Sequence, residues 1–328
     1  MRSSWWAVAL LAGCGDSGSA DADAAPVVID AALDAHGGPP ALDRVCGGGL
    51  AAPGVQASWY VIDSLLVPSS SAAANSVAMN VDGFSGVENA LGTFLGILGG
   101  LGIEHQVATD EAVSEGRQLQ LVAVATETPV VSEAVTVLVR VGADQDDDAG
   151  DNYSGAESFD LVETPSDGAL PGRLAGSFLC AGLAPAPILV TLRQGRDPIT
   201  LPVFAAKVEV DHDPDGLTLG RLGGAITIDV VDELLVPELR AACNDLIQED
   251  CPDMQCDEGS PGEELAMVFD DDNDLVISLE EFLSNDIVDG YLRDPDLDLL
   301  DGDVPGSDGT KESLSFGFGF NAVTAVVP

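Results

Sequence analysis

Oxygen-bearing residues recur at regular spacing in one twelve-residue segment, residues 270–281. At positions 1, 3, 5, 7, 9 and 12 of this segment stand Asp270, Asp272, Asp274, Val276, Ser278 and Glu281. Carboxylate, hydroxyl and backbone carbonyl oxygens are the ligands that Ca²⁺ prefers, and these are the loop positions that supply them. The spacing therefore predicts a Ca²⁺ site, with a solvated acidic loop as the alternative.

The segment and its surroundings, residues 263–292, resemble an EF-hand. Ile277 is the apolar eighth residue, and Phe269 and Phe282 flank the loop as core residues of two expected helices. One departure is Leu275 at position six, where the family has glycine because the turn requires a positive φ. A leucine in that conformation costs about 1–2 kcal/mol. Either the affinity for Ca²⁺ is therefore weak, or the loop turns differently.

Further acidic clusters surround this segment. Asp296, Asp298 and Asp301 follow the second expected helix, and we interpret them as a second metal site, since such a density of acids repels itself unless cations neutralise it. Two other acidic stretches, residues 144–151 and 211–216, are interpreted as solvated turns.

The N-terminus has the order of an export signal. Arg2 precedes an apolar run over residues 5–12, which is far shorter than the ~20 residues that span a bilayer. Residues 11–14, Leu-Ala-Gly-Cys, resemble the lipobox of bacterial lipoproteins. The resemblance implies a signal peptide over residues 1–13 and a lipid on the new N-terminal residue, Cys14. An ordinary signal peptide followed by a chance cysteine is the alternative.

A flexible tether is expected after the lipidated cysteine. Residues 14–44 are rich in Ala, Asp, Gly and Ser, a composition that stays solvated. We therefore expect an exported protein held to the cell envelope by its lipid, at the outer membrane, its periplasmic face or the cell surface. The membrane is its first expected partner, and a cell-surface or polysaccharide partner is the second.

Export implies an oxidising compartment, in which disulfides persist. The cysteines that remain besides Cys14 are Cys46, Cys180, Cys243, Cys251 and Cys256. Because five is an odd number, at least one thiol stays free or pairs between chains. We expect one bridge within the cluster 243–256 and one between Cys46 and Cys180. A zinc site in the cluster is disfavoured, since its spacing is not that of a zinc finger and no histidine lies nearby.

The charge of the chain excludes some partners. Among 328 residues, 56 are acidic and 12 are Lys or Arg, which gives a formal net charge of −44. A nucleic-acid binder needs cations to displace counterions from phosphate, so nucleic acid is not an expected partner. Disorder throughout is also disfavoured, because 46% of the residues are hydrophobic.

Apolar patterning predicts a mainly β fold, an antiparallel β-sandwich or barrel with a helical, EF-hand-like insertion before the last strand. Expected strands cover residues 55–68, 117–126, 134–142, 158–163, 174–180, 187–193, 199–210 and 217–229. The predicted divisions are a β-rich domain over 45–229, an acidic helical calcium-binding insertion over 230–312, and a closing strand over 313–328. Helices are expected over 87–101 and 230–249, the second with a kink or break at Pro237.

No catalytic motif stands out. The chain has no HExxH and no G-x-S-x-G, and its histidines, His36, His105 and His212, are expected at the surface or as helix caps. The whole pattern resembles Asp-rich surface lipoproteins of high-GC Gram-negative bacteria, which implies no particular activity. We expect a non-catalytic protein with a Ca²⁺-binding structural or adhesive role. The alternative is a secreted hydrolase or carbohydrate-binding protein that uses the β-sandwich face.

Overall fold

The computed structural model describes most of the chain from Cys46 to Pro328. The described ranges are 46–82, 86–146, 148–162, 168–183, 186–193, 198–213, 215–300, 304–305 and 309–328. The expected signal peptide, Cys14 and the tether lie outside these ranges, and so does Asp301. Within the described ranges, no helix is both long enough and apolar enough to cross a membrane.

The expected mainly antiparallel β fold is confirmed. A ten-stranded sheet comprises β1 (Ala57–Leu66), β2 (Gln120–Thr126), β3 (Val131–Asp144), β4 (Phe159–Leu161), β5 (Ala169–Ala175), β6 (Phe178–Gly182), β7 (Ile188–Arg193), β8 (Pro198–Asp213), β9 (Gly216–Thr227) and β12 (Ser313–Ala325). The order runs β2-β1-β12-β9-β8-β6-β5-β3-β4, with β7 beside β8. Since β2 also pairs with β3, the strand pairings return to their starting point.

The last strand takes its place in this sheet because of its alternating sequence. β12 pairs antiparallel with both β1 and β9. Its large residues Leu314, Phe316, Phe318 and Phe320 are buried, and the small residues between them face a covering layer. A side chain at Gly317 would come within 2.8 Å of the carbonyl oxygen of Val77, so this approach requires glycine.

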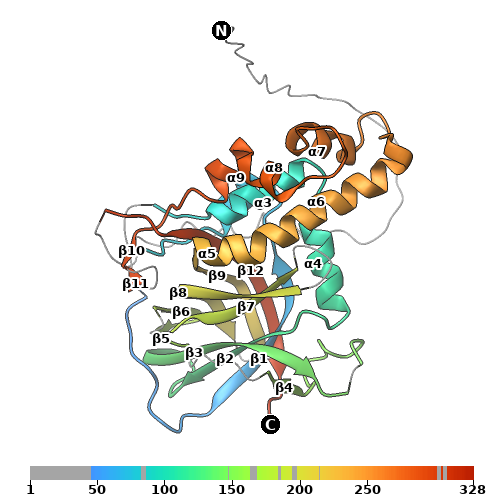
Figure 1. Ribbon diagram of the computed structural model, residues 1–328. Coiled ribbons are helices and arrows are strands. Elements are labelled where there is room, and N and C mark those ends of the chain that lie inside the picture. Colours follow the sequence, from blue (N-terminus) through green and yellow to red (C-terminus); the bar gives the residue numbers. More distant parts are fainter. Residues whose placement is uncertain are drawn as a thin grey trace, which may run out of the picture.

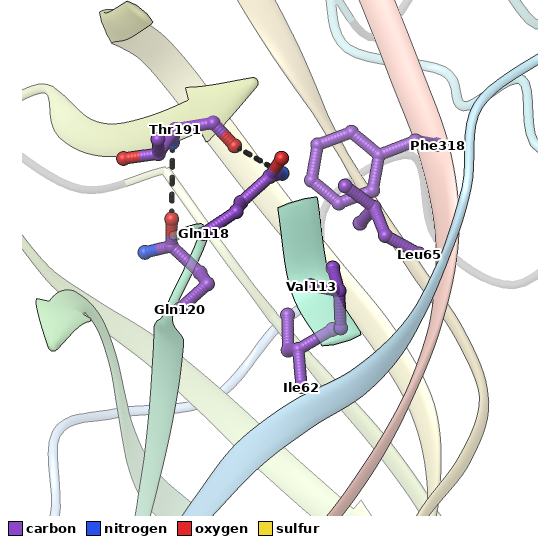
Figure 2. Close-up of a pocket in the computed structure, with 7 residues that line it drawn as sticks. All are labelled: Ile62, Leu65, Val113, Gln118, Gln120, Thr191 and Phe318. Carbon is purple, nitrogen blue, oxygen red and sulfur yellow. Dashed lines mark hydrogen bonds between the residues drawn. The ribbon is translucent and has the colours of Figure 1, made fainter. Parts of the chain in front are cut away.

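Glutamine side chains hydrogen-bond the backbone N–H and carbonyl groups along one edge of β7. Nε2 of Gln118 donates to the Thr191 carbonyl, and Oε1 of Gln120 accepts the Thr191 N–H (Figure 2). Nε2 of Gln120 also donates to the Leu189 carbonyl. Beside them lies an apolar cavity of about 10 Å³, lined also by Phe318 and other apolar side chains. That volume is about the space of one water molecule, so this cavity is not a substrate cleft.

Most helices gather at one end of the sheet, opposite the C-terminus, while α4 lies along one side (Figure 1). They are α2 (Ser71–Ser76), α3 (Ala90–Gly100), α4 (His105–Ser114), α5 (Ile228–Val230), α6 (Val236–Asp250), α7 (Pro261–Phe269), α8 (Leu279–Ser284) and α9 (Asp286–Tyr291). A short hairpin, β10 (Leu299–Leu300) and β11 (Val304–Pro305), follows α9. The interiors of the sheet and of this helical layer belong to one hydrophobic core.

Of the kink or break expected at Pro237, the break is wrong. A π-helical turn over Val231–Leu235 joins α5 to α6, and Pro237 lies in the first turn of α6. Proline lacks an N–H and crowds the carbonyl four residues before it, and a π turn is one way for a helix to accommodate that. The chain therefore stays helical across the proline.

Several expected boundaries are also corrected. The single strand expected over 174–180 is divided between the end of β5 and the start of β6, because the chain reverses between them at Gly176 with a φ of 68°. The helix expected after Leu279 is divided into α8 and α9, because Asn285 has an extended backbone and its side chain caps α9 by accepting the Ile287 N–H. The short helices α2 and α4 were not expected.

The cysteines pair as expected from their positions. Cys46 bonds Cys180, and Cys251 bonds Cys256. Cys243 is a free thiol on α6, and burial raises its pKa to about 12. A thiol with such a pKa is almost fully protonated at neutral pH, so Cys243 acts as a small core residue.

His105, expected at the surface or as a helix cap, is instead buried in the first turn of α4, whose N-cap is Glu104. Its side chain is only 3% exposed, and its Nε2 has no hydrogen-bond partner within the described ranges. Burial lowers the pKa of His105 to about 4, so the imidazole is neutral in the folded protein. His212 is partly exposed, and its Nε2 lies 3.0 Å from the hydroxyl of Tyr60.

Candidate metal centre

The candidate ion loop connects α7 to α8. Ser260 caps the start of α7 by accepting the Glu263 N–H, and Pro261 occupies its first turn. The rings of Phe269 and Phe282 are both buried and stack with their centroids 5.6 Å apart. This contact brings together the end of α7 and the start of α8, so the ends of the intervening loop are fixed by the core.

Three carboxylates of the loop come together. One oxygen each of Asp270, Asp272 and Asp274 lies within 4.8 Å of the others. Asp270 is buried, with 7% of its surface exposed, whereas Asp272 and Asp274 face solvent. Partial desolvation and then the negative charges of Asp274 and Glu281 raise the pKa of Asp272. The arrangement concentrates negative charge at one point.

Asp270 organises the turn of the loop from within. Its Oδ1 accepts the N–H of Asn273 at 2.8 Å, and its Oδ2 accepts the N–H of Leu275 at 2.7 Å. Asn273 and Leu275 both have a φ of 61°. The backbone at Leu275 is therefore left-handed, which is the conformation expected at position six of a calcium loop, although the residue is not glycine. The Leu275 side chain packs against the hydrophobic core, and this contact offsets part of the backbone cost.

Glu281 closes the loop from its far end. Its Oε1 accepts the N–H groups of Asp271 and Asp272, and its Oε2 accepts the N–H of Ser278. Ser278 in turn accepts the N–H of Glu281, which makes a capping box at the start of α8. The hydrogen bonds from Ser278 lower the pKa of Glu281, so its carboxylate is ionised at neutral pH.

Two side chains of α6 bind the backbone of the loop. The Ile277 N–H donates to Oδ1 of Asn244 at 2.7 Å, and the Ile277 carbonyl accepts Nδ2 of Asn244 at 3.0 Å and Nη1 of Arg240 at 3.1 Å. Ile277 is fully buried, whereas the side chain of its neighbour Val276 is exposed. Sequence reasoning did not single out Asn244 or Arg240. Their four-residue spacing on an expected helix was the available signal, but it does not reveal what that face touches.

Of the residues expected at the second metal site, Asp296 and Asp298 lie within the described ranges and both accept hydrogen bonds, and the site itself stays a prediction. Oδ1 and Oδ2 of Asp296 accept the backbone N–H and the hydroxyl of Ser315, and Asp298 accepts the Gly309 N–H. Asp301 lies outside the described ranges. The charge of Asp296 also affects Glu88. Burial, followed by the negative charges of Asp82 and Asp296, raises the pKa of Glu88 to about 7.

The other two acidic stretches differ from each other. Oδ1 of Asp213 accepts the N–H groups of Asp215 and Gly216, which builds the tight turn between β8 and β9. In the first stretch, carboxylate oxygens of Asp144 and Asp146 lie within 4.8 Å of one another and of Glu157. These are exposed or partly exposed side chains beside a chain reversal, as in many solvated loops.

Similarity to known proteins adds nothing to this geometry, since the chain matches no known protein family, no curated protein and no solved structure.

Proposed function

We propose that the loop from Asp270 to Glu281 binds one Ca²⁺ ion. The observation that carries the proposal is the convergence of three carboxylates on a turn whose sixth residue, Leu275, already has a positive φ. Backbone strain of this kind persists only where the surrounding structure imposes it. The positive φ at the sixth position supports the proposal, because the turn of a calcium loop is made there.

The donors present fit the ion. Ca²⁺ is a hard cation that takes six to eight oxygen ligands, and it would be held by the carboxylates of Asp270, Asp272, Asp274 and Glu281, the carbonyl of Val276 and the hydroxyl of Ser278. A bound divalent cation supplies positive charge where these carboxylates now repel one another. After partial desolvation, that repulsion is the next cause that raises the pKa of Asp272.

The role that follows is structural. The loop joins α7 to α8, and both helices contact α6, which crosses the end of the sheet (Figure 1). An ion in the loop would rigidify this helical layer, which we interpret as an EF-hand-like insertion between β9 and the closing strand. The pairing of β2 with both β1 and β3 supports the barrel rather than the sandwich for the sheet itself.

We propose in addition that the protein is exported and anchored by a lipid on Cys14. The support is the sequence of residues 11–14 after a short apolar run, together with the Cys46–Cys180 and Cys251–Cys256 disulfides. An anchored, Ca²⁺-rigidified, non-catalytic module with a structural or adhesive role in the cell envelope is the function that combines these features.

Direct titration tests the ion site. Calorimetry with CaCl₂ should give one site in the wild-type chain, with a Kd on the order of 10⁻⁴–10⁻³ M, the range of extracellular modules. Glu281→Gln should lose most of the binding, because it removes the charged bidentate ligand. Glu280→Gln, the same change one residue earlier at an exposed position, is the matched control and should bind as the wild type does. Equal binding by all three chains would contradict the proposal.

A further inference from the structure

The backbone of Ile277 is held on both sides by one side chain of another helix. Asn244 of α6 accepts its N–H at 2.7 Å and donates to its carbonyl at 3.0 Å. A side-chain amide offers one acceptor and two donors, so it can satisfy both backbone groups of a residue, as a neighbouring strand would. Ile277 itself is buried, so water is a poor substitute for this partner.

The first hydrogen bond fixes the direction of a candidate ligand. The described residues contain no cis peptide bond. In a trans peptide the N–H of one residue and the carbonyl of the residue before it lie in one plane and point in opposite directions. Because the Ile277 N–H points at Asn244, the Val276 carbonyl points away from Asn244. Val276 is the loop residue whose carbonyl is expected to bind the ion.

The second hydrogen bond has the same effect on Glu281. The Ile277 carbonyl and the Ser278 N–H share the next peptide plane, so the Ser278 N–H also points away from Asn244. On that side it donates to Oε2 of Glu281 at 2.8 Å. The orientation of this peptide therefore decides where the carboxylate of the twelfth loop residue is anchored.

From this geometry we infer that Asn244 is the positioning residue of the ion loop, which directs both the Val276 carbonyl and the Glu281 carboxylate. The inference rests on the proposed Ca²⁺ function and deepens it. Asn244 lies outside the loop, and its side-chain amide hydrogen-bonds the backbone of Ile277, which is not one of the proposed ligands. It acts through Ile277, and Arg240 assists by donating to the same carbonyl at 3.1 Å. Groups that orient metal ligands in this way typically change metal affinity by about 10–100-fold when they are removed.

The consequence is that the ion and α6 are coupled. If Asn244 increases the affinity for Ca²⁺, then bound Ca²⁺ must strengthen the hydrogen bonds of Asn244 by the same factor, because coupling free energies are reciprocal. Occupancy of the loop would thereby be felt by α6, the helix that lies across the end of the sheet (Figure 1).

The test is a Ca²⁺ titration of the full-length chain, followed by the amide signals of Ile277 and Ser278 in ¹⁵N NMR spectra. Asn244→Leu keeps the size of the side chain and removes both hydrogen bonds, and it should weaken Ca²⁺ binding about 10–100-fold. Gln248→Leu removes an amide from an exposed position of the same helix and should leave the Kd within about twofold. A merely structural role would lower the melting temperature in chelator and leave the Kd of the folded protein unchanged.

Outcomes for the two proposals are separable. Wild-type binding with an unchanged Kd in Asn244→Leu overturns the role of Asn244 and leaves the ion site standing. No binding by the wild type removes the ion site, and the inference with it. If Asn244→Leu does not fold, hydrogen exchange in the wild type decides: exchange of the Ile277 N–H should slow about 10-fold or more when Ca²⁺ saturates the loop. Unchanged exchange at saturation would overturn the inference.

Discussion

Asp270 and Leu275 are joined across the turn of the candidate ion loop: Oδ2 of the aspartate accepts the leucine N–H at 2.7 Å, while the leucine holds a φ of 61°. The hydrogen bond and the packing of the leucine side chain against the core both favour a backbone conformation that a side chain normally disfavours. Favourable packing of the side chain and an unfavourable left-handed backbone therefore occur together at Leu275, and substitutions can separate these two contributions to stability.

Comparing Leu275→Gly with Leu275→Ala separates the cost of the left-handed backbone from the loss of side-chain packing. Both variants lose the packing of the leucine side chain, but only glycine is relieved of the backbone conflict. Leu275→Ala should therefore be less stable than Leu275→Gly by about 1–2 kcal/mol, the cost of a left-handed conformation for a residue with a Cβ. Urea denaturation in chelator gives the comparison. A glycine variant no more stable than the alanine variant would show that the turn is unstrained.

Burial of neutral His105 predicts a loss of stability in acid. The pKa of His105 is about 4 in the folded protein and about 6.5 in the unfolded chain. Between these values only the unfolded state takes up the proton, so the free energy of unfolding falls as the pH falls from about 6.5 to about 4. This loss of unfolding free energy reaches about 3 kcal/mol at pH values below about 4, and it is absent above about pH 6.5.

The slope of stability against pH provides the measurement for His105. His105→Gln should flatten it in this window, whatever the substitution does to stability at neutral pH. The same change at His212, which is partly exposed and lies beside Asp213, should flatten it less. An unaltered slope in His105→Gln would mean that carboxylates alone cause the acid sensitivity.

The two disulfides should contribute unequally. Cys46–Cys180 closes a separation of 134 residues and Cys251–Cys256 one of 5 residues. The loop-closure model gives about 5 kcal/mol for the first and about 2 kcal/mol for the second. Cys46→Ser with Cys180→Ser should therefore lower the urea midpoint more than Cys251→Ser with Cys256→Ser. The reverse order would show that the long loop is already closed by other contacts in the unfolded chain.

Cys14→Ser tests the proposed anchor. The acyl chains would supply nearly all the membrane affinity, and one chain alone binds only marginally while the lipoprotein pattern supplies three. The variant should move from the membrane pellet to the soluble fraction after cell fractionation. Arg2→Gln, which leaves the lipidated residue in place, should stay with the membrane if it is exported. Membrane partitioning unaffected by Cys14→Ser would contradict the anchor.

Sequence patterns predicted the features that depend on local alternation or on simple pairing. The alternation of Leu314 to Phe320 identified the last strand, and the Cys46–Cys180 bridge is present. The positive φ of Leu275 is one of the two outcomes that its place in the loop left open. Contacts between distant elements were not accessible. Nothing in the order of residues shows that Asn244 meets Ile277, because that meeting depends on how α6 packs.

The buried state of His105 was missed for a related reason. Its helix α4 packs against β1 and β7, and burial of a polar residue there comes from tertiary packing that overrides its usual surface preference. The continuity of the helix through Pro237 depends on a π turn, and the proline predicts an irregularity there without deciding between a kink and a break. The closed order of strands likewise depends on β2 pairing with both β1 and β3.

Thermal unfolding with Ca²⁺ and with chelator is the most direct test of whether the loop from Asp270 to Glu281 is a Ca²⁺ site that stabilises the fold. A ligand that binds only the folded state adds about 1.4 kcal/mol at ten times its Kd. Millimolar CaCl₂ should therefore raise the melting temperature more than NaCl of equal ionic strength, which only screens the acidic repulsion. Glu281→Gln should remove that excess while keeping the capping box, since glutamine also serves there. An equal shift with NaCl, or an undiminished Ca²⁺ shift in Glu281→Gln, would contradict the account.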